Sequence, residues 1–515
     1  MASDSKVVKS LFKGGAIVFL GLVFSKLIGL VYRVLVGRFL GPEAYGIISV
    51  MIAVFSVAAI IAYVGIPQGV QKYIADFRGK NDIAGQVGAA RIGLIMVTAS
   101  SVVTGLALFL LAPWIATEIF NDPRTLWPIR FVALVLPLRG FRKVFTSITE
   151  GYEKMQYKVY ALHFYANITK VLLTAIVIWL GYGYLEVAGV FAFAYGTAFI
   201  VAGYFAYKML PEAFKPGIKG RYETKKMFSH SWPLFAAGLL TVVAGYIDTF
   251  MLQAFLGSRE VGLYNAAYPF AALITIGGSI FGSIYLSNAS KLYGQGKTSE
   301  MSSAYRLIVK WISLATIPVF LILFMFPVAA LQVFGAEYLE MDNVLRILAV
   351  GFLASALIGP VNRTLQAIER TKINLYVTLF TGTTNIGLNY LLIPAYGVIG
   401  AATATATTFM LAFILKFAII YKLTGSQPFR PVIGKIVLSG LIAALTVYGI
   451  ARILFESTPH WYIIPATLTF GAVYTALIVI TRTIEKEDLE ILKYIREKTG
   501  IENPRIEKII RKYAN

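Results

Sequence analysis

The sequence predicts an all-α membrane protein that crosses the bilayer about fourteen times. The 515 residues are 57% hydrophobic and only 14% charged, whereas soluble domains are nearer one quarter charged. The hydrophobic residues gather in stretches of about 20, the length of a helix that crosses a bilayer. The short segments between these stretches alternate between rich and poor in Lys and Arg, as the loops of a polytopic membrane protein do.

Fourteen hydrophobic stretches define the predicted spans, and a charged segment follows them. No cleavable signal peptide is expected, because the first stretch is too long for a signal-peptide core and no small-residue cleavage pattern follows it. The final segment, 482–515, is expected to form a cytoplasmic tail with one or two amphipathic helices, broken near Asn503 and Pro504. The predicted spans are 14–36, 44–66, 90–112, 127–149, 159–181, 187–208, 231–255, 262–287, 306–329, 344–367, 373–393, 398–421, 433–454 and 461–481.

The distribution of Lys and Arg predicts the orientation. With the N-terminus inside, 36 of the 47 basic residues fall in cytoplasmic segments and 6 in external ones. Arg142 and Lys143 are counted here with the cytoplasmic loop after the fourth span. Because short cytoplasmic loops carry the excess of positive charge, both termini are predicted to lie in the cytoplasm of a protein of the cell membrane. This asymmetry explains most of the net charge of +21, so nucleic-acid binding is not expected.

An internal duplication divides the first twelve predicted spans into halves. Three pairs of short motifs recur in register, at offsets of 216 to 218 residues. They predict two six-helix lobes, 1–212 and 229–424, related as parallel repeats, with two further spans in 432–481. Transporters built from such repeats bind substrate between the halves and alternate access to it. The pairs are Phe39-Leu40-Gly41 with Phe255-Leu256-Gly257, Gly46 with Gly262, and Asn167-Ile168 with Asn385-Ile386.

Charges inside the predicted spans are the strongest functional signal, because charge there is costly and usually functional. One embedded acid cannot neutralise five embedded cations, so the interior is expected to contain water and to recruit an anion. Lysine and arginine suit phosphate in particular, and the first four cations are the predicted phosphate contacts. Near a cytoplasmic end, snorkelling is an equal alternative for Arg139 and the favoured one for Lys416. The cations are Lys26, Arg33, Arg139, Lys170 and Lys416, and the acid is Asp248.

Asp248 also belongs to a set of oxygen-bearing side chains suited to a small hard cation. Asn385 and Asn389 lie one helical turn apart, and Thr405 lines the following span. Together these four residues are candidates for coupling transport to Na⁺ or H⁺. The alternatives are ordinary hydrogen bonds between helices and, for Asp248, pairing with an embedded lysine, either Lys26 or Lys170.

Enzymatic signatures are missing from the sequence. It contains no Walker A loop, GxSxG elbow, HExxH motif or external DxD pair. It also has no cysteine and only three scattered histidines, so no other metal site or cofactor is expected. We therefore expect a protein that is not an enzyme.

Two stretches, 24–46 and 392–405, resemble the polysaccharide transporter (oligosaccharide flippase) family of the multidrug/oligosaccharidyl-lipid/polysaccharide exporter superfamily. The first reads FSKLIGLVYR followed by GRFLGPEAYG, and the second reads LIPAYGVIGAATAT. The second also recurs in multidrug and toxin extruders and in lipid II flippases. The resemblance covers nearly the whole chain. It implies a fourteen-helix fold with two lobes around a central cavity.

The resemblance also implies a substrate and matching site residues. Family members turn polyprenyl- or dolichyl-(pyro)phosphate-linked sugars from the inner to the outer leaflet. Lys26 and Arg33 match in kind the first-span basic residues that contact pyrophosphate in lipid II flippases. The four candidate ion ligands match the sodium site of those flippases, except that Asn389 stands where an acid is expected.

The sequence thus predicts a flippase for lipid-linked oligosaccharides that works by alternating access. One alternative is a cation-coupled multidrug extruder of the same fold, which should have an acidic cavity rather than a cationic one. The other is a membrane glycosyltransferase or ligase acting on the same lipid-linked sugar. We expect a monomer whose partners are the lipid-linked oligosaccharide and membrane lipids, without nucleic acid.

Overall fold

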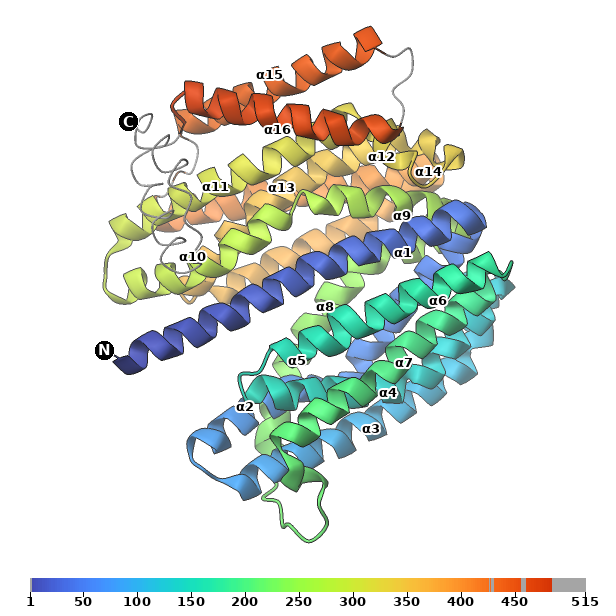
Figure 1. Ribbon diagram of the computed structural model, residues 1–515, viewed down its shortest axis with the longest axis vertical. Helices are drawn as coiled ribbons and strands as arrows, with labels where there is room; N and C mark the ends of the chain where they lie inside the picture. Colours follow the sequence, from blue (N-terminus) through green and yellow to red (C-terminus); the bar gives the residue numbers. More distant parts are fainter. Residues whose placement is uncertain (1, 426, 428–429, 455–459, 484–515) are drawn as a thin grey trace. The chain divides into compact units, whose positions relative to one another are not determined.

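The computed structural model describes residues 2–425, 427, 430–454 and 460–483, and these residues form helices and connecting turns without a strand (Figure 1). Each of the fourteen predicted spans lies on helix, which confirms the predicted fold class. The predicted amphipathic helices of the tail lie outside the described residues.

Two compact units divide the chain, Met1–Asn265 and Ala266–Asn515. In the first unit, α8 packs against α1 and α2, so this unit extends beyond the predicted lobe 1–212. The lobe boundaries themselves remain a prediction. The first unit contains α1 (Ala2–Tyr63), α2 (Ile66–Gly79), α3 (Ile83–Trp114), α4 (Leu126–Gly151), α5 (Gln156–Lys158), α6 (Asn167–Trp179), α7 (Tyr184–Met209), α8 (Thr224–Phe255) and the start of α9 (Ser258–Leu273).

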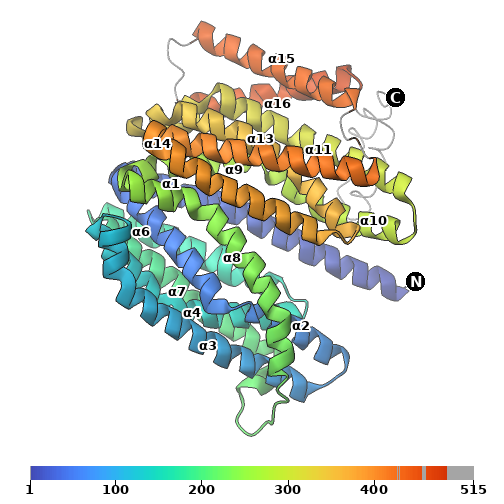
Figure 2. The same cartoon turned by 180° about the vertical axis from the view of Figure 1, so that it is seen from behind.

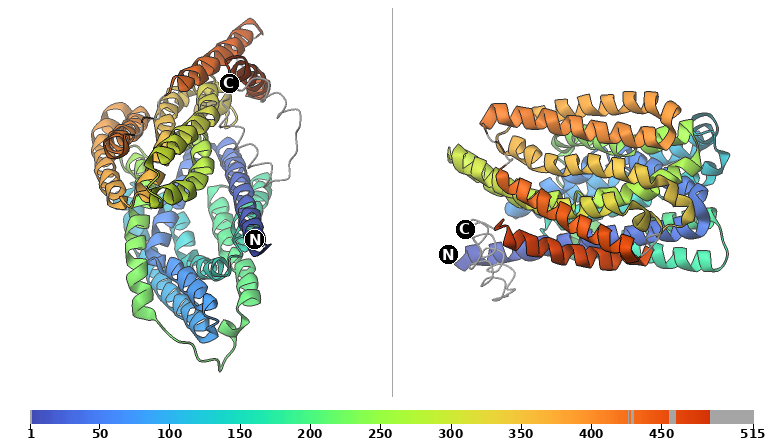
Figure 3. Two further views of the ribbon diagram at one scale, coloured as in Figure 1. Left: turned by 90° about the vertical axis from the view of Figure 1, so that its left-hand side faces the viewer. Right: turned by 90° about the horizontal axis from the view of Figure 1, so that it is seen from above.

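The second unit is built around α13, which packs against α10, α11 and α14 (Figure 2). Helices α15 and α16 lie side by side, and α15 also packs on α11 (Figure 3). Ile317, Ala444 and Phe470 belong to the buried apolar cluster that joins them. Besides the rest of α9, the unit contains α10 (Ile276–Gly294), α11 (Thr298–Met325), α12 (Pro327–Leu331), α13 (Asp342–Ala367), α14 (Thr371–Thr424), α15 (Pro431–Leu454) and α16 (Ile463–Ile480).

Nine helices in the described part of the chain are long and apolar enough to cross a membrane, and Ile464–Ile480 is a shorter apolar helix. Two of the nine, α1 and α14, each hold two predicted spans. They change direction at Gly41 (φ 81°) and Gly397 (φ 58°), where glycine adopts a left-handed conformation that other residues avoid. Gly257, the counterpart of Gly41 in the repeat, also has a positive φ of 100°.

The duplicated motifs meet inside the first unit. A Cβ atom on Gly46 would overlap the carbonyl oxygen of Ser258, and one on Gly262 would overlap the carbonyl oxygen of Pro42. Ser258 follows Pro42 by the same offset that separates Gly262 from Gly46, so the two contacts are equivalent. A reciprocal contact of this kind is what a two-fold relation between the repeats produces.

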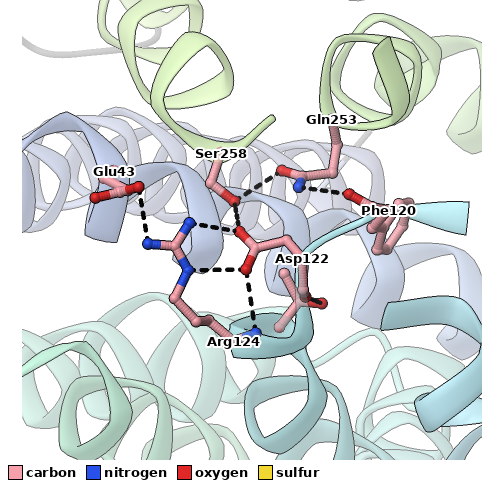
Figure 4. A network of polar contacts seen from close by, with 7 residues as sticks. Glu43, Phe120, Asp122, Arg124, Gln253 and Ser258 are labelled. Carbon is pink, nitrogen blue, oxygen red and sulfur yellow. Dashed lines mark hydrogen bonds and ion pairs between the residues drawn. The ribbon is translucent and has the colours of Figure 1, made fainter. Parts of the chain in front are cut away.

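A hydrogen-bonded network beside this contact joins α1, the connection before α4, and the turn between α8 and α9 (Figure 4). Asp122 accepts hydrogen bonds from Arg124 Nε at 2.8 Å and Nη2 at 3.0 Å, and from Ser258 Oγ at 2.6 Å. Arg124 Nη1 also pairs with Glu43 Oε1 at 2.8 Å. Gln253 accepts from Ser258 Oγ at 3.0 Å. The buried Asp122 carboxylate is therefore the centre of the network.

The ionisation of Asp122 links this network to pH. Burial opposes the charged form, but hydrogen bonds from Arg124 and Ser258 outweigh it and hold the pKa of the Asp122 carboxyl below its usual value. A lowered carboxyl pKa stabilises the folded protein above the unfolded pKa of about 4. That stabilisation is lost as the pH falls through the folded-state pKa.

We predict that Asp122→Ala lowers the free energy of unfolding by about 2 kcal/mol at pH 7, because a buried hydrogen-bond centre is removed. The difference from the wild type should shrink as the pH falls below about 4, because the unfolded chain then binds a proton at Asp122, whereas the folded carboxylate does so only at a lower pH. Unfolding followed by tryptophan fluorescence in detergent from pH 3 to 8 measures both effects. Asp76→Ala is the control, because Asp76 pairs with Lys80 on the exposed surface and such pairs contribute little. A difference that does not vary with pH would contradict the role of Asp122.

Candidate functional site

Four helices of the first unit bring basic residues from distant parts of the sequence together. Helix α1 packs against α4, α6 and α7, and α7 packs against both α4 and α6 (Figures 1 and 2). Arg139 and Arg142 lie three residues apart on α4, which places them on the same side of that helix. Lys170 lies on α6 and is buried, with 5% of its surface exposed. We call Arg139, Arg142 and Lys170 the cationic centre.

An aromatic cluster surrounds the cationic centre. It consists of Tyr32 and Phe55 from α1 and Phe191 and Tyr195 from α7. The ring centroids of Phe191 and Tyr195 are 4.6 Å apart, those of Phe55 and Phe191 are 5.8 Å apart, and those of Tyr32 and Phe191 are 6.4 Å apart. The cluster thus forms a continuous set of rings between α1 and α7.

Two of the cations lie over these rings. The Arg139 guanidinium is 4.0 Å from the centre of the Phe55 ring, and Lys170 Nζ is 4.4 Å from that of Tyr32. The negative face of an aromatic ring attracts a cation, by up to about 2 kcal/mol where water is excluded. The rings therefore hold the two cations in place without neutralising their charge.

Hydrogen bonds to neutral groups complete the positioning of these two cations. Arg139 Nη1 donates to the backbone carbonyl of Phe55 at 3.1 Å, and Lys170 Nζ donates to Asn167 Oδ1 at 3.2 Å. Asn167 in turn donates to Ser25 Oγ of α1 at 2.9 Å. A π-helical segment, Val159–Ala166, directly precedes Asn167, and such segments are frequent at functional sites.

Arg142 is the member of the centre that sequence reasoning missed. It is counted above with a cytoplasmic loop, but it lies within α4 and is only 4% exposed. Its Nε is buried without a hydrogen-bond partner, and its polar neighbours include the phenols of Tyr63 and Tyr195. Its spacing of three from Arg139 within one predicted span is the signal that would have identified it.

Tyr195 marks the middle of this arrangement. It interacts electrostatically with all three members of the cationic centre, Lys170, Arg139 and Arg142. Among the described residues, no carboxylate lies within ion-pair distance of any of the three cations. Such an excess of buried positive charge is suited to binding an anion.

The two predicted phosphate contacts of α1 lie in different surroundings. Lys26 is exposed and makes no hydrogen bond or ion pair with any residue that the structure describes. Arg33 is half-buried, and its Nη1 donates to the Tyr45 hydroxyl at 3.3 Å. That hydroxyl donates to the backbone carbonyl of Asn265 at 2.8 Å. Arg139 and Lys170 therefore share a site, whereas no contact within the described residues joins Lys26 to them.

Asp248 is buried in α8, and its Oδ2 accepts a hydrogen bond from the Tyr264 hydroxyl at 2.7 Å. Within the part of the chain that the structure describes, it forms no ion pair with Lys26 or Lys170. The Tyr264 hydroxyl is therefore a partner of Asp248, and pairing of this acid with an embedded lysine stays a prediction.

The other three candidate ion ligands lie on α14 in the second unit. Asn385, Asn389 and Thr405 are all buried, and Asn389 Nδ2 donates to Asn385 Oδ1 at 3.1 Å. Asp248 lies in the first unit and the other three candidate ligands lie in the second. The coupling of transport to an ion through these four residues therefore remains a prediction. Among the described residues, no group of three or more His, Asp or Glu side chains is arranged to hold a metal.

Lys416 does not snorkel as the sequence suggests. It is 6% exposed, and its Nζ donates to Asn362 Oδ1 of α13 at 2.9 Å. Because this amide lies 54 residues earlier in the chain, the sequence gives no sign that it is available. A hydrogen bond to a neighbouring helix thus replaces the expected contact with water.

Known proteins resemble this chain over most of its length. The family model described as "Polysaccharide biosynthesis protein" matches residues 11–285, and the model described as "MatE" matches 233–391. Stage V sporulation protein B of Bacillus subtilis is 23% identical over 521 residues, which cover 95% of this chain and 98% of that protein. The probable low-salt glycan biosynthesis flippase Agl15 of Haloferax volcanii is 24% identical over 236 residues, which cover 46% of this chain and 49% of that protein.

The structure of the lipid II flippase MurJ in an inward closed conformation is similar to this one. The two chains superpose with a TM-score of 0.70 at 17% sequence identity, and the match covers 90% of this chain and 98% of that one. This likeness confirms the two-lobe helical fold.

Proposed function

Because the chain belongs to the polysaccharide biosynthesis protein family, we propose that it is a flippase for polyprenyl- or dolichyl-(pyro)phosphate-linked oligosaccharides. It would move them from the inner to the outer leaflet of the cell membrane as a transporter, without acting as an enzyme. The observation that carries this proposal is the cationic centre, whose three basic side chains are not neutralised by any carboxylate of the described residues. The name of the flippase relative from Haloferax volcanii supports it.

The geometry supports a mechanism of charge neutralisation. A phosphate group entering the cationic centre would exchange its hydration for hydrogen bonds from arginine and lysine, which lowers the cost of moving the charge through the membrane. The polyprenyl tail would stay in the lipid. Alternating access of the two repeats would then expose the headgroup on the other side. Since the sequence has no nucleotide-binding motif, an ion gradient acting at Asp248 is the driving force that we propose.

The cationic centre argues against the multidrug alternative. The match of the MatE model to residues 233–391 concerns the fold that the two groups share. An extruder of cationic drugs needs acidic groups in its binding site, because like charges repel. The cationic centre would repel such substrates.

Flipping in proteoliposomes tests the proposal. We expect the purified protein to move a fluorescent pyrophosphate-linked oligosaccharide between leaflets without added nucleotide sugar. Lys26→Ala and Arg33→Ala should each slow this movement by about tenfold, because each removes a charged phosphate contact worth about 1.5 kcal/mol. Lys80→Ala, which removes an exposed charge far from these residues in the sequence, serves as the control and should flip normally. A wild-type protein that leaves the lipid in place, or makes a new product when a nucleotide sugar is added, would refute the proposal.

The direction of transport depends on the orientation, which is a separate prediction. Single cysteines can report on it because the natural chain has none. Lys219 and Glu340 are both exposed, and the distribution of basic residues places position 219 inside and position 340 outside. In intact cells, a membrane-impermeant maleimide should label Glu340→Cys at once and Lys219→Cys only after permeabilisation. The reverse pattern would invert the proposed direction.

A further inference from the structure

The connection between α7 and α8, residues 210–223, lies at the edge of the first unit. In Figure 1 it is the lowest part of this unit, below α2 and α3, and Figure 3 shows it in the same place. It joins the two predicted repeats, and the distribution of basic residues places it on the cytoplasmic side. Its outer side chains are exposed, so this connection presents a surface at the periphery of the unit.

Arg91 of α3 holds the backbone of this connection in place. Its guanidinium donates to four backbone carbonyls, those of Ala213 at 2.9 Å, Ile218 at 2.5 Å, Lys215 at 2.6 Å and Glu212 at 3.3 Å. Because these carbonyls satisfy one guanidinium, the segment has a defined conformation although it contains little regular structure. A surface fixed in this way loses less conformational entropy when a ligand binds.

Arg221 fixes the end of the connection to the start of α3. Its backbone N–H donates to the carbonyl of Ala84 at 2.9 Å, and its side chain pairs with Asp82 at 2.7 Å. A Cβ atom on Gly88 would overlap the carbonyl oxygen of Arg221, so the two backbones are in close contact. The connection is therefore tied to α3 at several points along its length.

Four lysines in and beside the connection carry charges that no acid neutralises. All four are exposed, and among the described residues no carboxylate lies within ion-pair distance of any of them. Two other basic residues nearby are paired, Arg221 with Asp82 and Lys226 with Glu223. The four lysines are Lys208, Lys215, Lys219 and Lys225.

Exposed aromatic rings lie between these lysines in the sequence. The exposed fractions are 64% for Tyr204, 52% for Tyr207, 37% for Phe214 and 52% for Tyr222. The Phe214 ring lies 5.8 Å from that of Tyr207. Aromatic side chains gather at the headgroup level of a membrane, where one end of the ring system is apolar and the other wet. A soluble acidic partner would explain the lysines, but a lipid surface explains the lysines and the rings together.

We propose that the connection between α7 and α8 is a binding surface for anionic phospholipid headgroups of the cytoplasmic leaflet. The four lysines supply the charge, and Arg91 positions the backbone that carries two of them, Lys215 and Lys219. The ligand is a lipid of the surrounding membrane rather than the transported one, so this inference goes beyond the proposed function. Each lysine near an anionic membrane surface contributes about fivefold in affinity.

Native mass spectrometry of the full-length protein in detergent, titrated with phospholipid, tests this surface. Phosphatidylglycerol should bind the wild type more tightly than phosphatidylcholine does. Changing all four lysines to glutamine should weaken phosphatidylglycerol binding at least about 20-fold, since several contacts of about fivefold each are lost. Without added lipid, this variant should unfold at the same temperature as the wild type, because its lysines are exposed and unpaired.

A second quadruple variant is the matched control. It changes Lys154, Lys291, Lys372 and Lys422 to glutamine, which are equally exposed and predicted to be cytoplasmic but belong to four other connections. It should bind phosphatidylglycerol as the wild type does. Arg91→Met keeps the four lysines of the proposed surface and removes their backbone support. It should weaken binding about fivefold, the cost of ordering a segment that is no longer held.

Three results would overturn the proposed surface. They are wild-type affinity after loss of its four lysines, an equal loss of affinity in the control variant, and equal binding of phosphatidylglycerol and phosphatidylcholine to the wild type. Wild-type affinity in Arg91→Met would overturn the positioning role of Arg91. All of these measurements record lipid binding without transport. A failure of the surface therefore leaves the proposed flippase function standing, and a protein that flips no lipid-linked sugar would still bind phosphatidylglycerol here.

Discussion

Lys170→Glu is expected to reduce flipping at least about 100-fold while the protein remains folded, a loss that corresponds to about 3 kcal/mol. The new carboxylate would lie beside Arg139 and Arg142 and would act as their internal counter-ion. The phosphate of the substrate would then compete with a permanently attached anion and would meet one cation fewer. Stability should stay constant or rise, because the variant pairs charges that are unpaired in the wild type.

Flipping in proteoliposomes and thermal unfolding of the same preparation measure the two effects together. Lys154→Glu makes the same charge change at an exposed position and should alter neither. A Lys170→Glu protein that flips as fast as the wild type would show that the cationic centre does not contact the substrate. One that fails to fold would show that Lys170 has a structural role instead.

Gly46→Ala is expected to destabilise the protein by about 3 kcal/mol or more, the upper range for forcing atoms into a packed interior. The added methyl group would overlap the carbonyl oxygen of Ser258, and backbone cannot move aside as a flexible side chain can. Gly262→Ala should have a similar effect through the carbonyl of Pro42. The yield of folded protein and its unfolding temperature in detergent measure both.

Gly245→Ala is the matched control for these substitutions. Gly245 lies within α8 and has no atom within 4 Å of an added Cβ, so alanine should stabilise the helix there by up to about 1 kcal/mol. The double variant Gly46→Ala, Gly262→Ala should cost less than the sum of its parts, because both methyl groups separate the same pair of segments. Full additivity would contradict a single shared contact.

The helical fold could be predicted from the sequence because it depends mainly on properties of each separate stretch of the chain. The length and hydrophobicity of each stretch decide whether a helix spans the bilayer, and both can be read without knowing any neighbour. The changes of chain direction within α1 at Gly41 and within α14 at Gly397 also depend on local backbone conformation rather than on distant neighbours. The extent of the first compact unit could not be predicted, because it depends on how α8 packs against α1 and α2.

The candidate site was only partly predictable, since burial of a cation depends on its neighbours. Lys170 was identified because it lies in the middle of a span, and Arg139 was identified as a candidate although snorkelling was an equal alternative for it. Arg142 was missed because basic residues near the end of a span are typical of cytoplasmic loops. The aromatic cluster was missed as well, because nothing in a membrane sequence rich in Phe and Tyr shows which rings face one another.

The reciprocal packing of Gly46 and Gly262 has a consequence for symmetry. A contact that maps onto itself by a half-turn is isologous, the kind that joins two identical subunits in a closed dimer. A chain of half the length that carried this glycine contact could form the same contact with a second copy of itself. When both halves belong to one polypeptide, the sequence of each half can differ from that of the other. In the register that aligns Asn167 with Asn385, for example, Lys170 of the first half corresponds to Leu388 of the second. The charge of Lys170 can therefore exist once per molecule, which no symmetric dimer of identical halves would allow.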